Sequence, residues 1–308
     1  MDSGHVSVLL AEVLSLMQPQ PGGRYIDGTV GAGGHAAGLL AATAPDGQVL
    51  AFDLDPAAIA FARERLQADA SRITFVNASY ADMGRLAPTL GFNQVDGVLL
   101  DLGLSSRQLN DSRRGFSFLQ DGPLDMRFDP SQGVTAADLV NNLTEAELAD
   151  LFWRYGEERL SRKLARAVAA ARPLATTGQL RQVIEAAVGR RGKKHPATLV
   201  FQALRIAVNE ELAAVEKGLD AGIQLLKPGG RMAVISFHSL EDRLVKRTFR
   251  ELSRDCVCPP QQPVCTCAAK AVVRLVTRKA VQPGAAEVAA NPRSRSARLR
   301  VVEKLGAQ

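Results

Sequence analysis

The sequence predicts an α/β fold built on a doubly wound parallel sheet, with an all-helical region inserted into it. Three observations lead to this prediction. A β-α-β unit with a glycine-rich first turn spans Tyr25 to Asp53, and alternating strand and helix patterns continue to Asp101. Strand patterns disappear between Thr135 and Asn209 and return at Met232. A sheet that is left and re-entered in this way predicts one split domain with an insertion.

The first turn indicates a cofactor that contains a nucleoside. It lies between an apolar strand that ends at Ile26 and a helix over residues 36–44, and a second strand over residues 49–52 ends at Asp53. Glycine allows the backbone to approach a nucleotide closely, and an acid about 20 residues further on accepts hydrogen bonds from a ribose diol. The glycines of the turn are Gly31, Gly33 and Gly34.

The turn alone leaves the identity of that cofactor open. Residues 31–36, G-A-G-G-H-A, fit the dinucleotide pattern G-x-G-x-x-A. They also fit S-adenosylmethionine sites, in which an acid four residues before the G-x-G closes the first strand. Asp27 is that acid, although Thr29 stands where a common form of this pattern has glycine. A tight turn that binds nothing is the third interpretation.

Four successive strands are each followed by a polar or aromatic side chain. A helix over residues 56–66 separates the second strand from strands at 73–76 and 95–100. The carboxyl ends of parallel strands meet at one edge of the sheet, where ligands bind. The side chains at or just beyond these ends are Asp27, Asp53, Tyr80 and Asp101.

Composition favours a cytoplasmic protein with a polyanionic partner. Hydrophobic residues make up 46% of the 308 residues, which is ample for a core, and no apolar run of 18 residues or signal peptide is visible. The net charge is +6, and residues 151–200 alone carry +8. This basic block includes Arg190, Arg191, Lys193 and Lys194, which we expect to bind phosphates. The alternative is a solvated helical surface.

The region after the fourth strand predicts a long loop and then helices. Residues 102–130 are expected to form a lid or binding loop, because their polar sequence still carries Phe116 and Phe118. Thr144 begins a capping box with Glu147, and Thr177 is a candidate cap for another helix. The other predicted elements are helices at 5–17, 161–171, 196–212 and 210–226, a turn at 227–231 and a strand at 232–236.

The C-terminal part carries two further candidate sites. Two C-x-C pairs, Cys256 with Cys258 and Cys265 with Cys267, supply four thiolates that could share one tetrahedral zinc; reduced thiols are the alternative. Further along are four arginines that could contact phosphates or flank an edge strand at 299–302. They are Arg293, Arg295, Arg298 and Arg300.

Taken together, these motifs resemble the bacterial 16S ribosomal RNA cytosine-N(4) methyltransferases, the MraW or small-subunit methyltransferase H family. The matching stretches follow one another along nearly the whole chain. They are H-V-S-V-L-L-A-E at His5, Y-I-D-G-T-V-G-A-G-G-H at Tyr25, D-L-G-L-S-S-R-Q-L at Asp101, R-G-F-S-F-L-Q-D-G-P-L-D-M-R at Arg114, K-H-P-A-T at Lys194, F-Q-A-L-R-I-A-V-N-E-E-L at Phe201, I-S-F-H-S-L-E-D-R at Ile235 and N-P-R-S-R-S-A at Asn291.

The resemblance implies a class I methyltransferase fold, with residues 1–110 and 210–308 as the methyltransferase domain and 111–209 as a lid and helical substrate-recognition domain. It implies methyl transfer from S-adenosylmethionine to the N(4) amine of a cytosine in the decoding region of 16S ribosomal RNA, within the small subunit and away from membranes. A homodimer is one option for the assembly. The implied cofactor contacts are Gly33, Gly34, His35, Asp53, Tyr80, Asp101 and Gln108.

The chemistry requires acceptors for the amine hydrogens, since the amine lone pair is conjugated into the cytosine ring. Asp101, or a backbone carbonyl of Leu102 or Gly103, is expected to accept one amine hydrogen. Asp125 and His238 are further candidates for hydrogen bonding or proton removal. Phe116 or Phe118 would stack on the splayed base. A nicotinamide oxidoreductase and a non-catalytic RNA-binding module are the rival classes.

Overall fold

The computed structural model describes residues 7–189, 195–256, 258, 262, 264, 266–267 and 269–306. The chain divides into two compact units. One consists of Met1–Gly103 together with Leu212–Gln308, and the other is Leu104–Glu211. Each unit has hydrophobic core residues of its own.

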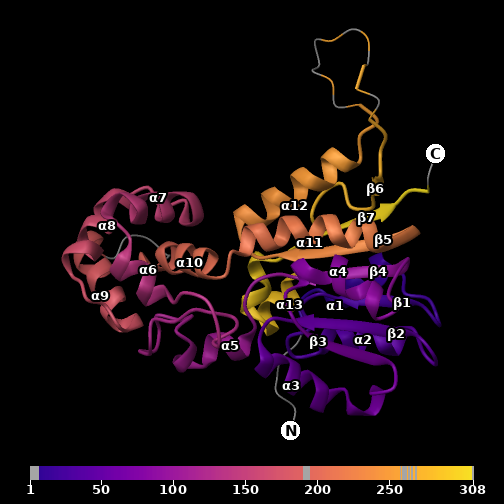
Figure 1. Ribbon diagram of the computed structural model, residues 1–308, viewed down its shortest axis with the longest axis horizontal. Coiled ribbons are helices and arrows are strands. Elements are labelled where there is room, and N and C mark those ends of the chain that lie inside the picture. Colours follow the sequence, from indigo (N-terminus) through magenta and orange to yellow (C-terminus); the bar gives the residue numbers. More distant parts are fainter. Residues whose placement is uncertain are drawn as a thin grey trace. The chain divides into compact units, whose positions relative to one another are not determined.

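The first unit contains a seven-stranded sheet in the described part of the chain (Figure 1). Its order is β3-β2-β1-β4-β5-β7-β6. Strands β1 to β5 are parallel, and β7 runs antiparallel to both of its neighbours. The bounds are β1 Arg24–Asp27, β2 Gln48–Asp53, β3 Ile73–Asn77, β4 Val95–Asp101, β5 Leu226–Ser236, β6 Val273–Leu275 and β7 Arg298–Lys304. The predicted doubly wound α/β fold is confirmed.

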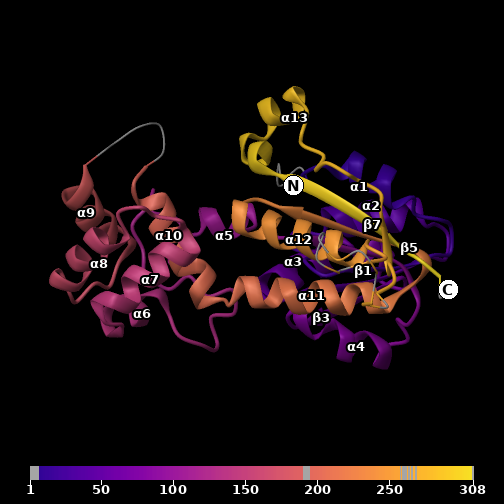
Figure 2. The same ribbon diagram turned by 90° about the horizontal axis from the view of Figure 1, so that it is seen from above.

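Helices cover both faces of this sheet, which is why its central strands read as continuous apolar runs. Along β1, Tyr25 packs into one layer and Ile26 into the opposite one. Helices α1, α2 and α3 cover the Tyr25 face, and α4, α11 and α12 cover the Ile26 face (Figure 2). The bounds are α1 Leu10–Met17, α2 Gly34–Ala42, α3 Pro56–Arg65, α4 Met83–Thr89, α11 Glu211–Leu225, α12 Ser239–Leu252 and α13 Ala285–Ala290, with the 3-10 helices η1 Gln67–Asp69, η2 Tyr80–Asp82 and η4 Pro292–Ser296.

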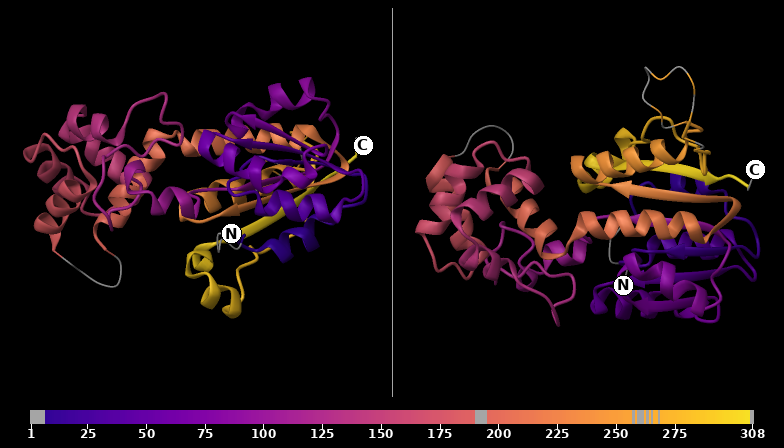
Figure 3. Two further views of the ribbon diagram at one scale, coloured as in Figure 1. Left: turned by 90° about the horizontal axis from the view of Figure 1, so that it is seen from below. Right: turned by 45° about the horizontal axis from the view of Figure 1, so that its top comes forward.

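The second unit is helical, and no strand is assigned among its described residues (Figure 3). Its helices surround a core that includes Phe152, Leu164, Leu180 and Leu204. The bounds are α5 Ser106–Asn110, η3 Ser112–Arg114, α6 Ala136–Asn142, α7 Glu145–Gly156, α8 Ser161–Ala170, α9 Thr177–Val188 and α10 Ala197–Val208. Among the described helices of the whole chain, none is long and apolar enough to cross a membrane.

Capping residues explain where two of these helices begin. The predicted capping box of α7 is present, because Thr144 and Glu147 exchange hydrogen bonds. The predicted cap of α9 at Thr177 is wrong by one residue. Thr176 is the cap, since its hydroxyl accepts from the Gln179 N–H and the Gln179 side chain accepts from the Thr176 N–H. Thr177 instead donates to the Gln120 carbonyl.

Three other expectations need correction. The helix predicted over 196–212 ends at Val208, because Glu210 has a φ of +49° and breaks it from α11. The turn predicted at 227–231 belongs to β5, as an irregularity where the pairing with β4 shifts register. The strand predicted at 299–302 is not at the edge, because β6 pairs with the outer side of β7.

Candidate functional site

Three titratable side chains meet at the carboxyl ends of the neighbouring strands β1 and β4. Asp27 ends β1 and is fully buried, and Asp101 ends β4. His35 lies in the first turn of α2, and its Nε2 is 3.5 Å from Asp101 Oδ2. The Asp101 N–H donates to Thr29 Oγ1 at 2.6 Å, which ties the end of β4 to the glycine turn.

Burial and neighbouring charge perturb two of these groups. The pKa of Asp27 is raised to about 6, mainly by burial; the charges of Asp101 and Asp53 add to the rise, and the charge of His35 and the hydrogen bond from the Thr29 N–H oppose it. Burial alone would lower the pKa of His35, but the close contact with Asp101 and its charge, with the charge of Asp27, raise it overall. Perturbed groups that cluster at the ligand-binding edge of a sheet mark a functional site.

The same cluster contains buried polar atoms that lack a hydrogen-bond partner among the described residues. They are Asp27 Oδ2, both ring nitrogens of His35, and Asp101 Oδ1. The 3.5 Å approach of His35 to Asp101 is an ion-pair contact without hydrogen-bond geometry. Unsatisfied buried polar groups are costly and are few in native proteins. Four such atoms in one place therefore indicate groups that are completed by a ligand.

The glycine turn is shaped by backbone conformation and by close packing. Gly31 and Gly33 have φ values of +49° and +77°, which favour glycine. A Cβ at Gly34 would come within 1.9 Å of Ser7 Oγ, so this glycine allows Ser7 to pack against the turn. The Gly31 N–H donates to Asp53 Oδ2 at 2.8 Å, which fixes the turn to the end of β2.

Asp53 and Tyr80 lie beyond the ends of the next two strands. Asp53 is half-buried, and its Oδ1 accepts from the Asp55 N–H at 2.9 Å. The Tyr80 ring packs against α11, because a Cβ at Gly218 would lie 2.6 Å from its Cδ2. Gly28 is also close to this residue, since a Cβ built there would lie 3.0 Å from Tyr80 Cβ. No sequence motif points to Gly218, and Thr29 stands out in the sequence only as a departure from a pattern.

Gln108, Asp125 and His238 each have a structural partner. Gln108 closes the capping box of α5 with Ser105. Burial raises the pKa of Asp125, but the hydrogen bonds and charge of Arg127 outweigh it and hold the pKa below its usual value. His238 caps α12, where its Nε2 is 3.1 Å from Glu241 Oε1. His238 Nε2 nevertheless lacks a hydrogen-bond partner among the described residues, so a catalytic role for Asp125 or His238 stays a prediction.

The predicted base-stacking rings are engaged within the helical unit. Phe116 is buried and stacks on Phe128 at 5.5 Å between ring centroids. Phe118 is half-buried and stacks on His195 at 4.6 Å. By contrast, Trp153 at the end of α7 is 57% exposed, and the sequence did not single it out. A lone tryptophan in an amphipathic helix carries no signal that separates a core ring from a surface one.

The basic block at Arg190, Arg191, Lys193 and Lys194 lies outside the described residues, as does Cys265. Arg293 and Arg295 are exposed in η4, and Arg298 is exposed at the start of β7. Arg300 is buried, and its Nε is 2.7 Å from Asp242 Oδ1, so it forms an internal ion pair.

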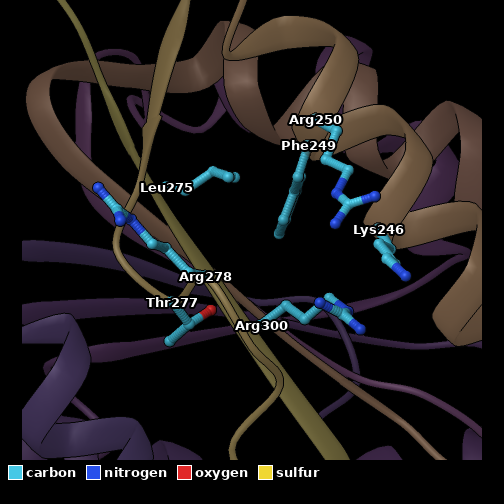
Figure 4. A pocket seen from close by; sticks show the side chains of 7 residues that line it. All are labelled: Lys246, Phe249, Arg250, Leu275, Thr277, Arg278 and Arg300. Atoms are coloured by element: carbon cyan, nitrogen blue, oxygen red, sulfur yellow. The ribbon is translucent and has the colours of Figure 1, made fainter.

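A basic hollow lies between α12, β6 and β7 (Figure 4). It is lined by Lys246 and Arg250 of α12, by Arg278 just after β6, and by Arg300. Lys246, Arg250 and Arg278 are exposed and have no ion-pair partner among the described residues. Figure 4 shows the charged ends of Lys246, Arg250 and Arg300 on one side of Phe249. This surface can accept an anion.

Comparisons with known proteins agree with this description. The model of the MraW methylase family matches residues 2–305. A ribosomal RNA small subunit methyltransferase H of Thermomicrobium roseum is 52% identical over 305 residues, which cover 98% of this chain and 94% of the relative. One from Citrifermentans bemidjiense is 52% identical over 310 residues, covering 99% of each. Among solved structures, a methyltransferase homolog from Pyrococcus horikoshii is similar with 13% identity and a TM-score of 0.45, covering 98% of this chain and 68% of that one.

The sheet, with its reversed strand β7 and its polar carboxyl edge, is that of a class I S-adenosylmethionine-dependent methyltransferase. The extent of the family match and the identity to curated relatives make the assignment more specific. The chain belongs to the MraW methylase family.

Proposed function

We propose that this chain transfers a methyl group from S-adenosylmethionine to the N(4) amine of a cytosine in the decoding region of 16S ribosomal RNA. The observation that carries the proposal is the cluster of Asp27, His35 and Asp101, with its unsatisfied atoms beside the glycine turn. The relatives named as ribosomal RNA small subunit methyltransferases support an RNA substrate. The cytoplasmic location and the homodimer stay predictions.

The residues present fit the proposed cofactor. S-adenosylmethionine carries an ammonium and ribose hydroxyls, which are hydrogen-bond donors, and the site offers the unsatisfied acceptor Asp27 Oδ2. Asp53 would hold the ribose, because a carboxylate oxygen that already accepts one N–H has a second lone pair. When bound, the cofactor supplies an electrophilic methyl group on its sulfonium.

Asp101 is the residue we assign to the cytosine amine. Its Oδ1 can accept one amine hydrogen, which turns the nitrogen lone pair away from the ring and toward the methyl group. As the nitrogen–carbon bond forms and the carbon–sulfur bond breaks, the amine must release a proton. In this proposal Asp101 receives that proton, and the nearby His35, beside Oδ2, helps to orient the carboxyl group. Most of the rate would come from orienting the two reactants.

Replacing Asp53 by alanine should weaken binding of S-adenosylhomocysteine, the product form of the cofactor, by about 1.5–3 kcal/mol, the cost of losing a hydrogen bond to a charged group. Calorimetry measures the change. Asp46→Ala, at an exposed acid in the turn before β2, is the control and should bind normally. Equal affinities of the two variants would show that Asp53 does not hold the ribose.

The class of cofactor is tested by thermal unfolding. S-adenosylhomocysteine should raise the melting temperature through binding to the folded state, whereas NADH should not. Transfer of a labelled methyl group to small-subunit RNA then tests the reaction. Protection by NADH alone would favour the rival oxidoreductase, and RNA binding without any cofactor effect would favour a binding module.

RNA binding should have a charged and an aromatic component. We assign phosphate contacts to Lys246, Arg250 and Arg278, because they are exposed and without ion-pair partners among the described residues. We assign base stacking to Trp153, whose ring is exposed. Exposed Arg159 and Arg162, on the chain that follows α7, add positive charge to the same helical unit, and we propose that this unit recognises the substrate.

These two assignments predict different salt dependences. Replacing Lys246, Arg250 and Arg278 together with alanine should weaken RNA binding and reduce the log–log salt slope by about 2–3, since each phosphate contact contributes about 0.7–0.9. Trp153→Ala should cost about 1–3 kcal/mol with the slope unchanged. A control with equal charge loss on other elements replaces Arg63, Arg85 and Lys217. Equal effects of the two triple variants would show that the hollow has no special role.

A further inference from the structure

The segment between α12 and β6 brings three thiols together. The Sγ atoms of Cys256, Cys258 and Cys267 all lie within 4.8 Å of one another. Cys256 Sγ and Cys267 Sγ are 3.9 Å apart, although 11 positions separate these residues along the chain. The sequence places a fourth cysteine, Cys265, in the second C-x-C pair, outside the described residues.

The separation of the sulfur atoms indicates a metal rather than a disulfide. A disulfide holds its sulfur atoms about 2.05 Å apart. In a tetrahedral site with zinc–sulfur bonds of about 2.3 Å, neighbouring sulfur atoms are about 3.8 Å apart, close to the 3.9 Å between Cys256 and Cys267. No disulfide joins the three described cysteines.

The described residues of this segment do not form a hydrophobic core. Its two ends are joined where the Val272 N–H donates to the Leu252 carbonyl at 2.8 Å and the Ala271 N–H donates to Asp255 Oδ1 at 3.1 Å. Beyond this point, none of the described residues from Cys256 to Lys270 is buried, and Val264 is 69% exposed. A stretch without a core of its own needs a cross-link or a metal to stay ordered.

We propose that Cys256, Cys258 and Cys267 bind a structural zinc ion. Thiolates are soft ligands that select zinc over hard cations. The sequence offers Cys265 as a candidate fourth ligand, and four thiolates would make a closed, non-catalytic site. The metal would fix the segment that leads into β6 and so to Thr277 and Arg278 of the basic hollow. This inference does not depend on the methyl-transfer reaction.

Metal analysis of protein purified without an affinity tag and under reducing conditions tests the proposal. We expect about one zinc per chain, and slow reaction of the thiols with a thiol reagent until a chelator removes the metal. Replacing zinc by Co²⁺ should give the visible absorption of a tetrahedral thiolate site. The double variant Cys256→Ser and Cys258→Ser should lose the zinc, while Val264→Ser, a serine at an exposed position of the same segment, should keep it.

Each alternative gives a different result. Zinc content near zero with four freely reactive thiols would overturn the proposal in favour of reduced cysteines, and zinc-free protein with no reactive thiols would indicate disulfides. Zinc retained by the double variant would place the metal elsewhere. Because metal content is measured without substrate, these outcomes are separate from a failure of the proposed methyl transfer.

Discussion

Replacing Asp101 by asparagine should lower kcat/KM for methyl transfer to the RNA by about 10²–10³-fold. The amide keeps one acceptor oxygen but loses the charge that holds the amine hydrogen and receives the proton. The unsatisfied Oδ1 at the carboxyl end of β4 is the physical basis of this expectation. Single-turnover rates at saturating RNA and cofactor separate the loss in chemistry from any loss in binding.

Asp82→Asn is the matched control for this variant. Asp82 is an exposed acid in η2 of the same unit, and its ion pair with Arg85 is long, at 3.8 Å. Its replacement should leave both rate and affinity unchanged. If Asp101→Asn reduced only the affinity for S-adenosylhomocysteine and left the single-turnover rate intact, Asp101 would be a cofactor ligand and not the acceptor of the amine proton.

Replacing Asp27 by asparagine should stabilise the ligand-free protein at pH 7.5 by up to about 3 kcal/mol. The pKa of Asp27 rises from 3.8 to about 6 on folding because the carboxyl is buried, and a difference of this size corresponds to about 3 kcal/mol. Between these values the folded state keeps a proton that the unfolded state has released. The free energy of unfolding therefore falls as pH rises through this range, and the full cost is present above about pH 6.

His35 changes the free energy of unfolding in the same direction as Asp27 when the pH rises. Its pKa is raised on folding, so its stabilisation is present below its unfolded value and is lost as pH rises through its folded value. Urea unfolding at pH 4 and pH 7.5 measures the effect of Asp27→Asn, which should be small at pH 4 and large at pH 7.5. Asp82→Asn should change stability little at either pH. Parallel pH profiles for Asp27→Asn and wild type would show that Asp27 carries no such cost.

The sequence was sufficient to predict every described strand except β6, and most of the helices, because these elements have strong local signals. Strands buried on both faces read as apolar runs, and the box at Thr144 marks the start of α7. The prediction from sequence failed where two residues that can cap a helix are adjacent in the chain. Thr176 and Thr177 are both able to cap, and only the reciprocal bonds to Gln179 select the first.

The sequence is enough to predict which side chains lie at the strand ends of the candidate site. It is not enough to predict the hydrogen bonds that join them. Asp27 and Asp101 were found because topology alone brings the ends of β1 and β4 together. The hydrogen bond from the Asp101 N–H to Thr29 joins residues 72 positions apart, and no motif encodes it. Likewise, Phe116 reads as an aromatic residue in a polar loop, and only the packing shows that it belongs to a core with Phe128.

The central claim is the methylation of one cytosine amine in 16S ribosomal RNA. The most direct measurement is mass-spectrometric mapping of methylcytidine in ribosomal RNA from a strain that lacks the gene for this chain. We predict that one N(4)-methylated cytosine of the decoding region is missing from that RNA. It should return when the wild-type chain is restored but not when the Asp101→Asn variant is. A deletion strain with an unchanged set of methylcytidines, or full restoration by the Asp101→Asn variant, would contradict the account.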